Sequence, residues 1–176
     1  MKTLMLLRHA KSDWNAPYKG DHGRKLNARG EKAAPAMGAF MKERGVLPDE
    51  IWCSTATRTR QTCTLLTSSW EDDVPVHFSD ALYGADERTL LAHATKSDPE
   101  SAAALLIAHN PGMHGLALDL IGEIADGVST LDLEMNLPTA ALAVFTFDID
   151  RWEDLAPHTG RLTCFQVPRK LSSETD

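Results

Sequence analysis

Residues 4–15 read LMLLRHAKSDWN, and they contain the pattern that decides the fold. A short uninterrupted apolar run such as residues 4–7 is typical of a central strand in a parallel sheet that is buried on both faces. Arg8 and His9 follow this run directly. In open α/β sheets, ligands bind beyond the carboxyl ends of the strands. We therefore predict a central strand over residues 3–7 that presents Arg8 and His9 at the edge of the sheet.

Apolar runs of strand length alternate with helical patterns along most of the chain. The expected strands cover residues 3–7, 50–53, 74–78, 102–108, 141–147 and 162–167. The expected helices cover residues 28–44 after an Asn27 cap, a segment from a Ser54 or Thr55 cap to about residue 70, residues 86–96, and residues 113–121 after Pro111. This alternation predicts an α/β protein with a single three-layer α/β/α domain and a mostly parallel central sheet. We expect the domain to span residues 1–168, followed by a polar C-terminal tail at residues 169–176.

Composition narrows the class of partner. The 176 residues carry a net charge of -7, which argues against a nucleic-acid or acidic membrane surface but still allows a locally positive pocket. The three cysteines are dispersed and lack zinc-ligand spacing, so a reducing compartment is expected. The apolar run at residues 4–7 is too short for a signal peptide, and no stretch reaches the roughly 20 residues of a membrane span. We expect a cytoplasmic protein.

Two further expected strands also end in cationic or imidazole side chains. Arg58 lies in the first turn of the helix after residues 50–53, and His109 follows residues 102–108 directly. A cation in a first helical turn opposes the helix dipole, and the conflict eases if an anion binds there. Together with Arg8 and His9, these side chains would form a cationic pocket about the size of one phosphate.

The same residues carry a resemblance to a known family. Arg8-His9-Ala10 resembles the Arg-His-Gly signature of the histidine phosphatase superfamily, with Ala10 in place of glycine, and the segment 54–62 resembles its second motif around Arg58. Within the superfamily, the chain looks most like the small SixA-like phosphohistidine phosphatases. The shared features are the LLRHAKS start, the Asp21, Arg24 and Leu26 loop pattern, the HNPG turn at residues 109–112, and the Pro138-Thr139 pair.

This resemblance implies a mechanism as well as a fold. His9 would be the nucleophile that forms a phosphohistidine intermediate, and Arg8, Arg58 and His109 would neutralise the phosphoryl oxygens. Asn15, together with Ser12 and Trp14, matches the extended Arg-His-Gly-x-Ser-x-Trp-Asn form of the signature and could donate one more hydrogen bond. No metal or other cofactor is expected. The implied substrate is phosphohistidine in a signalling or phosphotransfer protein.

Other functions remain open at this point. Larger family members carry a glutamate general acid, and Asp86 or Glu87 could serve here, although an acidic pair at a helix start is also simply favourable to the dipole. With such an acid, the protein would be a phosphomonoesterase acting on a small phosphorylated metabolite. A third interpretation is a phosphate-binding or phosphoprotein-binding module without turnover. A cysteine phosphatase is disfavoured, because only four residues separate Cys53 from Arg58 where its loop needs five.

Overall fold

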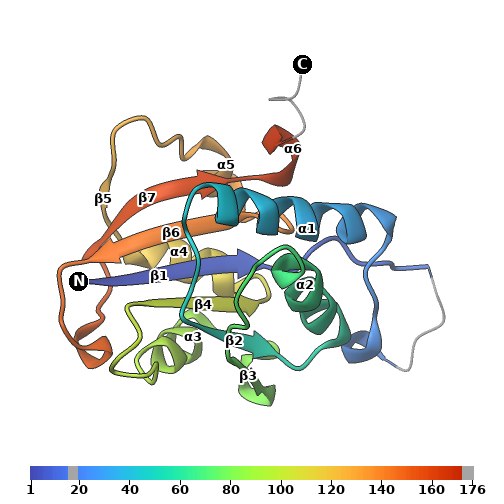
Figure 1. The fold of residues 1–176 in the computed structure, drawn as a ribbon, viewed down its shortest axis with the longest axis horizontal. Helices are drawn as coiled ribbons and strands as arrows, with labels where there is room; N and C mark the ends of the chain where they lie inside the picture. Colours follow the sequence, from blue (N-terminus) through green and yellow to red (C-terminus); the bar gives the residue numbers. More distant parts are fainter. Residues whose placement is uncertain (16–19, 172–176) are drawn as a thin grey trace.

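A computed structural model of the protein describes residues 1–15 and 20–171, which contain a seven-stranded mixed sheet. The strands are β1 Lys2–Arg8, β2 Glu50–Ser54, β3 Val76–Ser79, β4 Ala103–Ala108, β5 Ile121–Ile124, β6 Leu142–Phe147 and β7 Gly160–Gln166. Their order is β3-β2-β4-β1-β6-β7-β5, with β1 in the centre (Figure 1). Four of the six pairings are parallel, so the predicted mostly parallel sheet is confirmed.

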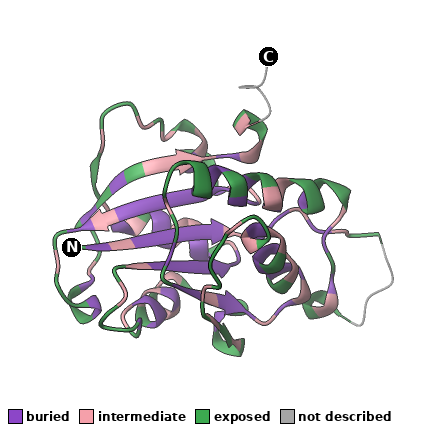
Figure 2. Cartoon of the chain, in the orientation of Figure 1, coloured by how far each residue is buried: buried purple, intermediate pink, exposed green. Residues whose placement is uncertain are grey.

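Helices cover both faces of this sheet, as the three-layer prediction requires. They are α1 Ala28–Glu43, α2 Thr57–Thr67, α3 Glu87–Ala94, α4 Gly112–Leu120, α5 Leu131–Met135 and α6 Pro168–Leu171. Alternate side chains of β1 enter different cores: Leu4 and Leu6 pack with residues of α3, α4 and α5, whereas Met5 and Leu7 pack with residues of α1 and α2. The buried strands between the two layers are plain in Figure 2. Burial on both faces explains why residues 4–7 are continuously apolar.

The strand register brings the expected site residues to one edge. Arg8 is paired with Ala108 in the parallel β1–β4 ladder, and Cys53 of β2 is paired with Ile107 on the other side of β4. The His9 amide donates to the Ala108 carbonyl, with a distance of 3.2 Å. The residues that follow β1, β2 and β4 therefore lie together at the carboxyl edge of three adjacent parallel strands.

The structure confirms one predicted helix cap and corrects another. The Asn27 side chain accepts a hydrogen bond from the Gly30 amide and starts α1 as expected. The prediction that Ser54 or Thr55 caps the next helix is wrong: Ala56 precedes α2, and no side chain caps that end. Ser54 is the last residue of β2, and its hydroxyl is 2.7 Å from a ring nitrogen of His109.

Several element boundaries differ from the prediction. Helix α2 ends at Thr67, helix α3 ends at Ala94, and residues 121–124 form strand β5, where the end of a helix was expected. Part of the expected C-terminal tail belongs to α6, which includes residues 169–171, and the rest of it lies outside the described residues. Among the described residues, no helix has both the length and the apolar character to cross a membrane.

Ala10, where the family signature usually has glycine, adopts a conformation open to any residue. The described non-glycine residues with positive φ are Ala140 and His158, so Ala10 does not adopt the left-handed conformation that favours glycine. The Ala10 side chain is fully buried in a small cluster with Leu26, Ala34 and Ala140. Its methyl group therefore has a packing role that glycine could not fill.

Candidate active site

His9 is buried and held in one orientation just beyond β1. Its Nδ1 lies 2.7 Å from the Ala10 carbonyl oxygen, which can only accept, so Nδ1 carries the proton and donates. The other nitrogen, Nε2, is then unprotonated, and its lone pair accepts a hydrogen bond from Arg58 Nε over 3.3 Å. The ring is only 6 % exposed. The backbone thus fixes both the tautomer and the direction of the lone pair.

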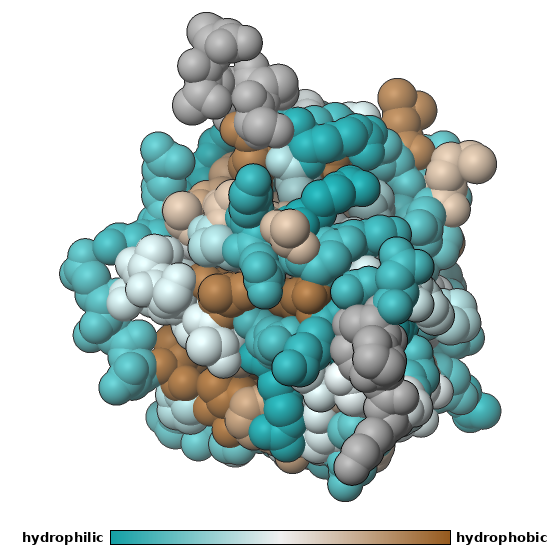
Figure 3. Space-filling view, turned by 90° about the vertical axis from the view of Figure 1, so that its right-hand side faces the viewer, coloured by the Kyte–Doolittle hydropathy of each residue, from teal (hydrophilic) through white to brown (hydrophobic). Residues whose placement is uncertain are grey.

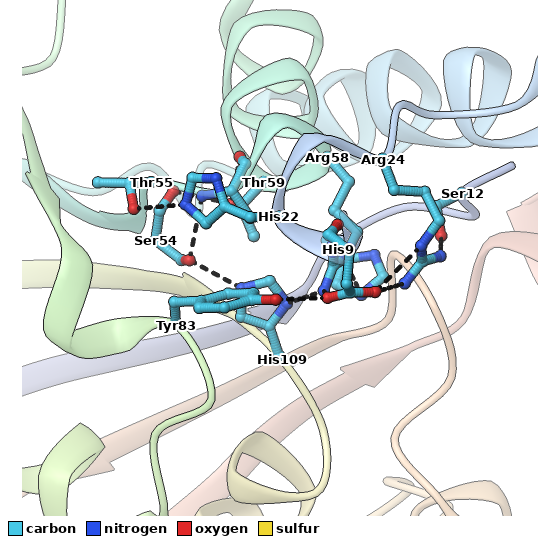
Figure 4. A network of polar contacts seen from close by, with 12 residues as sticks. His9, Ser12, His22, Arg24, Ser54, Thr55, Arg58, Thr59, Tyr83 and His109 are labelled. Carbon is cyan, nitrogen blue, oxygen red and sulfur yellow. Dashed lines mark hydrogen bonds and ion pairs between the residues drawn. The ribbon is translucent and has the colours of Figure 1, made fainter. Parts of the chain in front are cut away.

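Arg58 links the other members of the site from the first turn of α2. In addition to its bond to His9, it donates from Nη2 to His109 Nδ1 over 3.2 Å and to Asp21 Oδ2 over 3.1 Å. Its Nη1 donates to the Asp21 carbonyl oxygen over 2.9 Å. The guanidinium therefore lies between two imidazoles and the Asp21 carboxylate. Figure 4 shows Arg58 with His9 and His109.

His109 is held as firmly as His9. Because Arg58 can only donate, His109 Nδ1 accepts, and the proton on Nε2 is directed to the Ser54 hydroxyl at 2.7 Å. The two imidazole rings lie with centroids 5.2 Å apart and planes tilted by 54°. Ser54 thus orients His109, and this role was not predicted from the sequence.

Arg8, at the end of β1, contributes charge and an unused donor. Its Nη1 donates to the Leu137 carbonyl oxygen over 3.1 Å. Its Nε is buried and has no hydrogen-bond partner among the residues that the structure describes. A buried guanidinium N–H without an acceptor is unfavourable unless an anion completes the bond. This donor is an independent sign that the site takes an anion.

A carboxylate that was not among the predicted site residues completes the group. Asp21 accepts from Tyr83 Oη over 2.6 Å and from Arg24 Nη2 over 2.9 Å, in addition to Arg58. Arg24 also contacts the Ser12 hydroxyl. Asp21 and Arg24 were noted in the sequence only as part of a loop pattern. Their spacing could not show that this loop folds back onto α2.

Burial and neighbouring cations govern the charges in the site. Burial, together with the positive charges of Arg58 and Arg8, lowers the pKa of His9 to about 3, although the Ala10 hydrogen bond acts in the opposite direction. Burial and Arg58 likewise lower the pKa of His109 to about 3. The hydrogen bond from Tyr83, and then the cations Arg24 and Arg58, hold the pKa of Asp21 well below its usual range. At neutral pH both imidazoles are therefore uncharged, and the positive charge lies on the arginines.

Three of the predicted site residues are not brought into this network. Asn15 is exposed, and its backbone amide donates to Asp13. Asp86 is exposed and caps α3 by accepting from the Thr89 amide over 2.9 Å. Glu87 is half-buried, with its carboxylate beside Gly115 of α4. Among the described residues, no group of three or more His, Cys, Asp or Glu side chains could hold a metal ion.

Comparison with known sequences gives the family. The model of the histidine phosphatase superfamily (branch 1) matches residues 4–101. An uncharacterized protein of Mycobacterium leprae is 30% identical over 93% of this chain and 100% of its own length. A 2,3-bisphosphoglycerate-dependent phosphoglycerate mutase of Streptomyces avermitilis is 38% identical, but the match covers 51% of this chain and 40% of the mutase.

Solved structures agree with the sequence matches. A candidate phosphohistidine phosphatase SixA from Agrobacterium tumefaciens is 30% identical, has a TM-score of 0.79, and the match covers 95% of this chain and 98% of the other. A second candidate SixA, from Nakamurella multipartita, is 31% identical with a TM-score of 0.78, over 95% of this chain and 96% of the other. The fold, the arginine–histidine site and these matches lead to one conclusion: the chain belongs to the histidine phosphatase superfamily and is SixA-like.

Proposed function

We propose that this protein is a phosphatase that removes the phosphoryl group from phosphohistidine in a partner protein, through a phosphohistidine intermediate on His9. The observation that carries the proposal is the state of His9. It is a buried, uncharged imidazole whose Nδ1 donates to the Ala10 carbonyl and whose Nε2 lone pair faces the Arg58 guanidinium. A phosphate site made only for binding would need donors, not a nucleophile.

In the first step, His9 Nε2 attacks the phosphorus atom in line with the leaving nitrogen. A bond forms between Nε2 and phosphorus, the substrate N–P bond breaks, and its electron pair stays on the substrate imidazole. The Nδ1 proton remains on His9, where its bond to the Ala10 carbonyl stabilises the imidazolium-like intermediate. Since Nε2 is already unprotonated at neutral pH, the enzyme needs no base to prepare the nucleophile.

The arginines are proposed to take the charge that spreads over the phosphoryl oxygens. Arg58 donates to His9 and His109 in the free protein, and these donors can turn to phosphoryl oxygens when substrate is bound. The buried Arg8 Nε has no acceptor among the described residues and could supply another donor. Donors fixed in advance in a buried site are the largest usual source of catalysis in phosphoryl transfer.

The leaving group favours phosphohistidine over sugar phosphates. A ring-protonated phosphohistidine releases neutral imidazole, whose conjugate acid has an ordinary pKa of about 6.5, whereas an alkoxide needs a proton from a general acid. Asp86 is exposed and accepts the Thr89 amide as a helix cap. We propose that neither Asp86 nor Glu87 acts as a general acid. Water then completes the cycle by attacking the phosphorus of phospho-His9: the N–P bond breaks, its electron pair returns to Nε2, and a water proton passes to solvent.

The test compares substrates in the presence of EDTA. The purified protein is assayed against a histidine-phosphorylated phosphotransfer domain, free phosphohistidine, sugar phosphates and p-nitrophenyl phosphate. We expect the phosphohistidine substrates to be preferred, and EDTA to leave the rate unchanged. Preference for alkyl phosphates at neutral pH would overturn the substrate assignment, and no turnover on any phosphate would favour a binding module.

Matched histidine variants identify the nucleophile. His9→Ala should abolish turnover, whereas His158→Ala should leave it unchanged, because His158 is exposed and precedes the start of β7, which lies at the edge of the sheet opposite His9. Full turnover by His9→Ala would refute the nucleophile assignment.

The proposal also assigns the protein to the cytoplasm, where its three free cysteines would stay reduced.

A further inference from the structure

A second cationic pocket lies beside the active site and takes no part in the proposed chemistry. It has a volume of about 570 Å³ and lies between the first half of α1, the segment before β6, and α6. Its lining includes four cationic residues and no aspartate or glutamate: Lys11, Arg29 and Lys32, together with Arg169, which is paired with Asp132 of α5. Figure 3 shows the adjoining face at the carboxyl end of β1, where hydrophilic residues predominate.

Two segments that line this pocket continue directly from the active site. Lys11 is two residues beyond His9, and its carbonyl oxygen accepts from the Asn27 amide at the start of α1. On the opposite wall, Thr139 precedes Ala140, whose amide donates to the carbonyl oxygens of Arg8 and His9 over 3.0 and 3.1 Å. A partner whose phosphoryl group reaches His9 therefore has the pocket within its footprint.

Protein stability does not account for this arrangement of charge. Among the described residues, Lys11, Arg29 and Lys32 form no ion pair, in a protein whose net charge is -7. Arg29 and Lys32 are three residues apart on α1, a spacing at which like charges repel. Arg29 also lies in the first turn of α1, where a cation opposes the helix dipole. An external anion would relieve all three conflicts.

We infer that this pocket docks an acidic segment of the phosphoprotein substrate. The inference rests on the proposed function. It adds a surface by which the enzyme would recognise the substrate protein as well as its phosphohistidine. The pocket is far larger than one phosphate, and its cations come from three separate parts of the chain, which suits several carboxylates better than a second phosphoryl group. Exposed charges of this kind contribute little each to affinity, but together they steer the encounter of oppositely charged partners.

The experiment reverses the charge of the pocket and compares two substrates. Lys32→Glu and Arg29→Glu are assayed with a histidine-phosphorylated phosphotransfer domain that has an acidic surface, and with free phosphohistidine. We expect each variant to lower kcat/KM for the protein substrate by about tenfold at low salt, with a smaller effect at high salt. Turnover of free phosphohistidine should stay at the wild-type value. The matched control is Lys96→Glu, which reverses an exposed lysine beyond α3.

Each outcome has one meaning. An equal loss on both substrates would place these cations in the chemistry and overturn the docking proposal. An unchanged kcat/KM for the protein substrate, or an equal loss in Lys96→Glu, would also overturn it. Failure of the wild-type protein to turn over any phosphohistidine would instead refute the proposed function, and it would be seen before any variant is compared.

Discussion

At the scale of single residues, the state of His9 and His109 sets the pH behaviour. Burial and the nearby arginines lower the pKa of each ring to about 3, so both rings should stay neutral as the pH falls from 8 to 5. The nucleophile then keeps its lone pair throughout this range. Proton NMR of the ring resonances tests this directly, and we expect no titration of either ring above about pH 4. A midpoint near 6.5 for His9 would contradict the account of a buried, uncharged nucleophile.

The acidic pair at the start of α3 separates the two enzymatic interpretations. Asp86→Asn keeps an acceptor for the Thr89 amide, so the helix cap survives while the acidic proton is lost. If imidazole leaves without a general acid, Asp86→Asn and Glu87→Gln should both keep kcat on phosphohistidine within about twofold. Steady-state assays with both substrate classes measure this. A loss of about a hundredfold in either variant would show that the residue supplies a proton after all.

At the scale of elements, close packing of α1 against α2 holds Arg58 in place. A Cβ atom on Gly38 would lie 1.9 Å from the Leu66 carbonyl oxygen, which belongs to the α2 backbone and cannot rotate away. Gly38→Ala should therefore force the two helices apart and lower the free energy of unfolding by about 2 kcal/mol. Urea denaturation gives the value, and kcat should fall as well because α2 carries Arg58.

The control for this substitution is Gly115→Ala in α4. There the new methyl group would meet the end of the Glu87 side chain at 3.3 Å, and that side chain can rotate. Alanine is also the better helix former. We expect stability to be unchanged or slightly raised. Equal destabilisation of the two variants would show that the α1–α2 contact has no special role.

Among the helices and strands, sequence patterns predicted some elements and missed others. The buried strands and the long helix α1 were predictable because their apolar periodicity and the Asn27 cap are local signals. Strand β5 was missed because Gly122 and Glu123 lack an apolar pattern, and it forms only through its pairing with β7. The Ser54 cap was predicted wrongly because its hydroxyl has a better partner in His109, a residue 55 positions away. Asp21 and Tyr83 were missed as site residues because their hydrogen bonds in the site join residues that are far apart in the sequence.

At the scale of the whole molecule, the buried histidines should make the fold sensitive to acid. Both pKa values are about 3 in the folded protein and near 6.5 in an unfolded chain, so the unfolded state binds more protons between these values. The stabilisation that comes from the lowered pKa values of the two histidines is fully present above about pH 6.5, and it is lost as the pH falls from there toward about 3. Each group contributes a slope of up to about 1.4 kcal/mol per pH unit, or up to about 4 kcal/mol for both between pH 7 and pH 5.

Urea unfolding across this range, with a double variant His9→Asn and His109→Asn, isolates the effect. The variant should lose much less stability on acidification than the wild-type protein does. Parallel pH profiles for the two proteins between pH 7 and pH 5 would contradict the lowered histidine pKa values, because the Asp21 carboxylate, whose pKa is also lowered, loses its stabilisation only below about pH 4.

The most direct test of the central claim is to trap the phosphorylated enzyme. The protein is mixed with a ³²P-labelled phosphohistidine substrate, quenched in base within milliseconds, digested, and mapped by mass spectrometry. We predict an acid-labile, base-stable phosphoramidate on the peptide that contains His9, and none in His9→Ala. Label on His109 or on a carboxylate, or full turnover with no labelled enzyme at any time, would contradict the account.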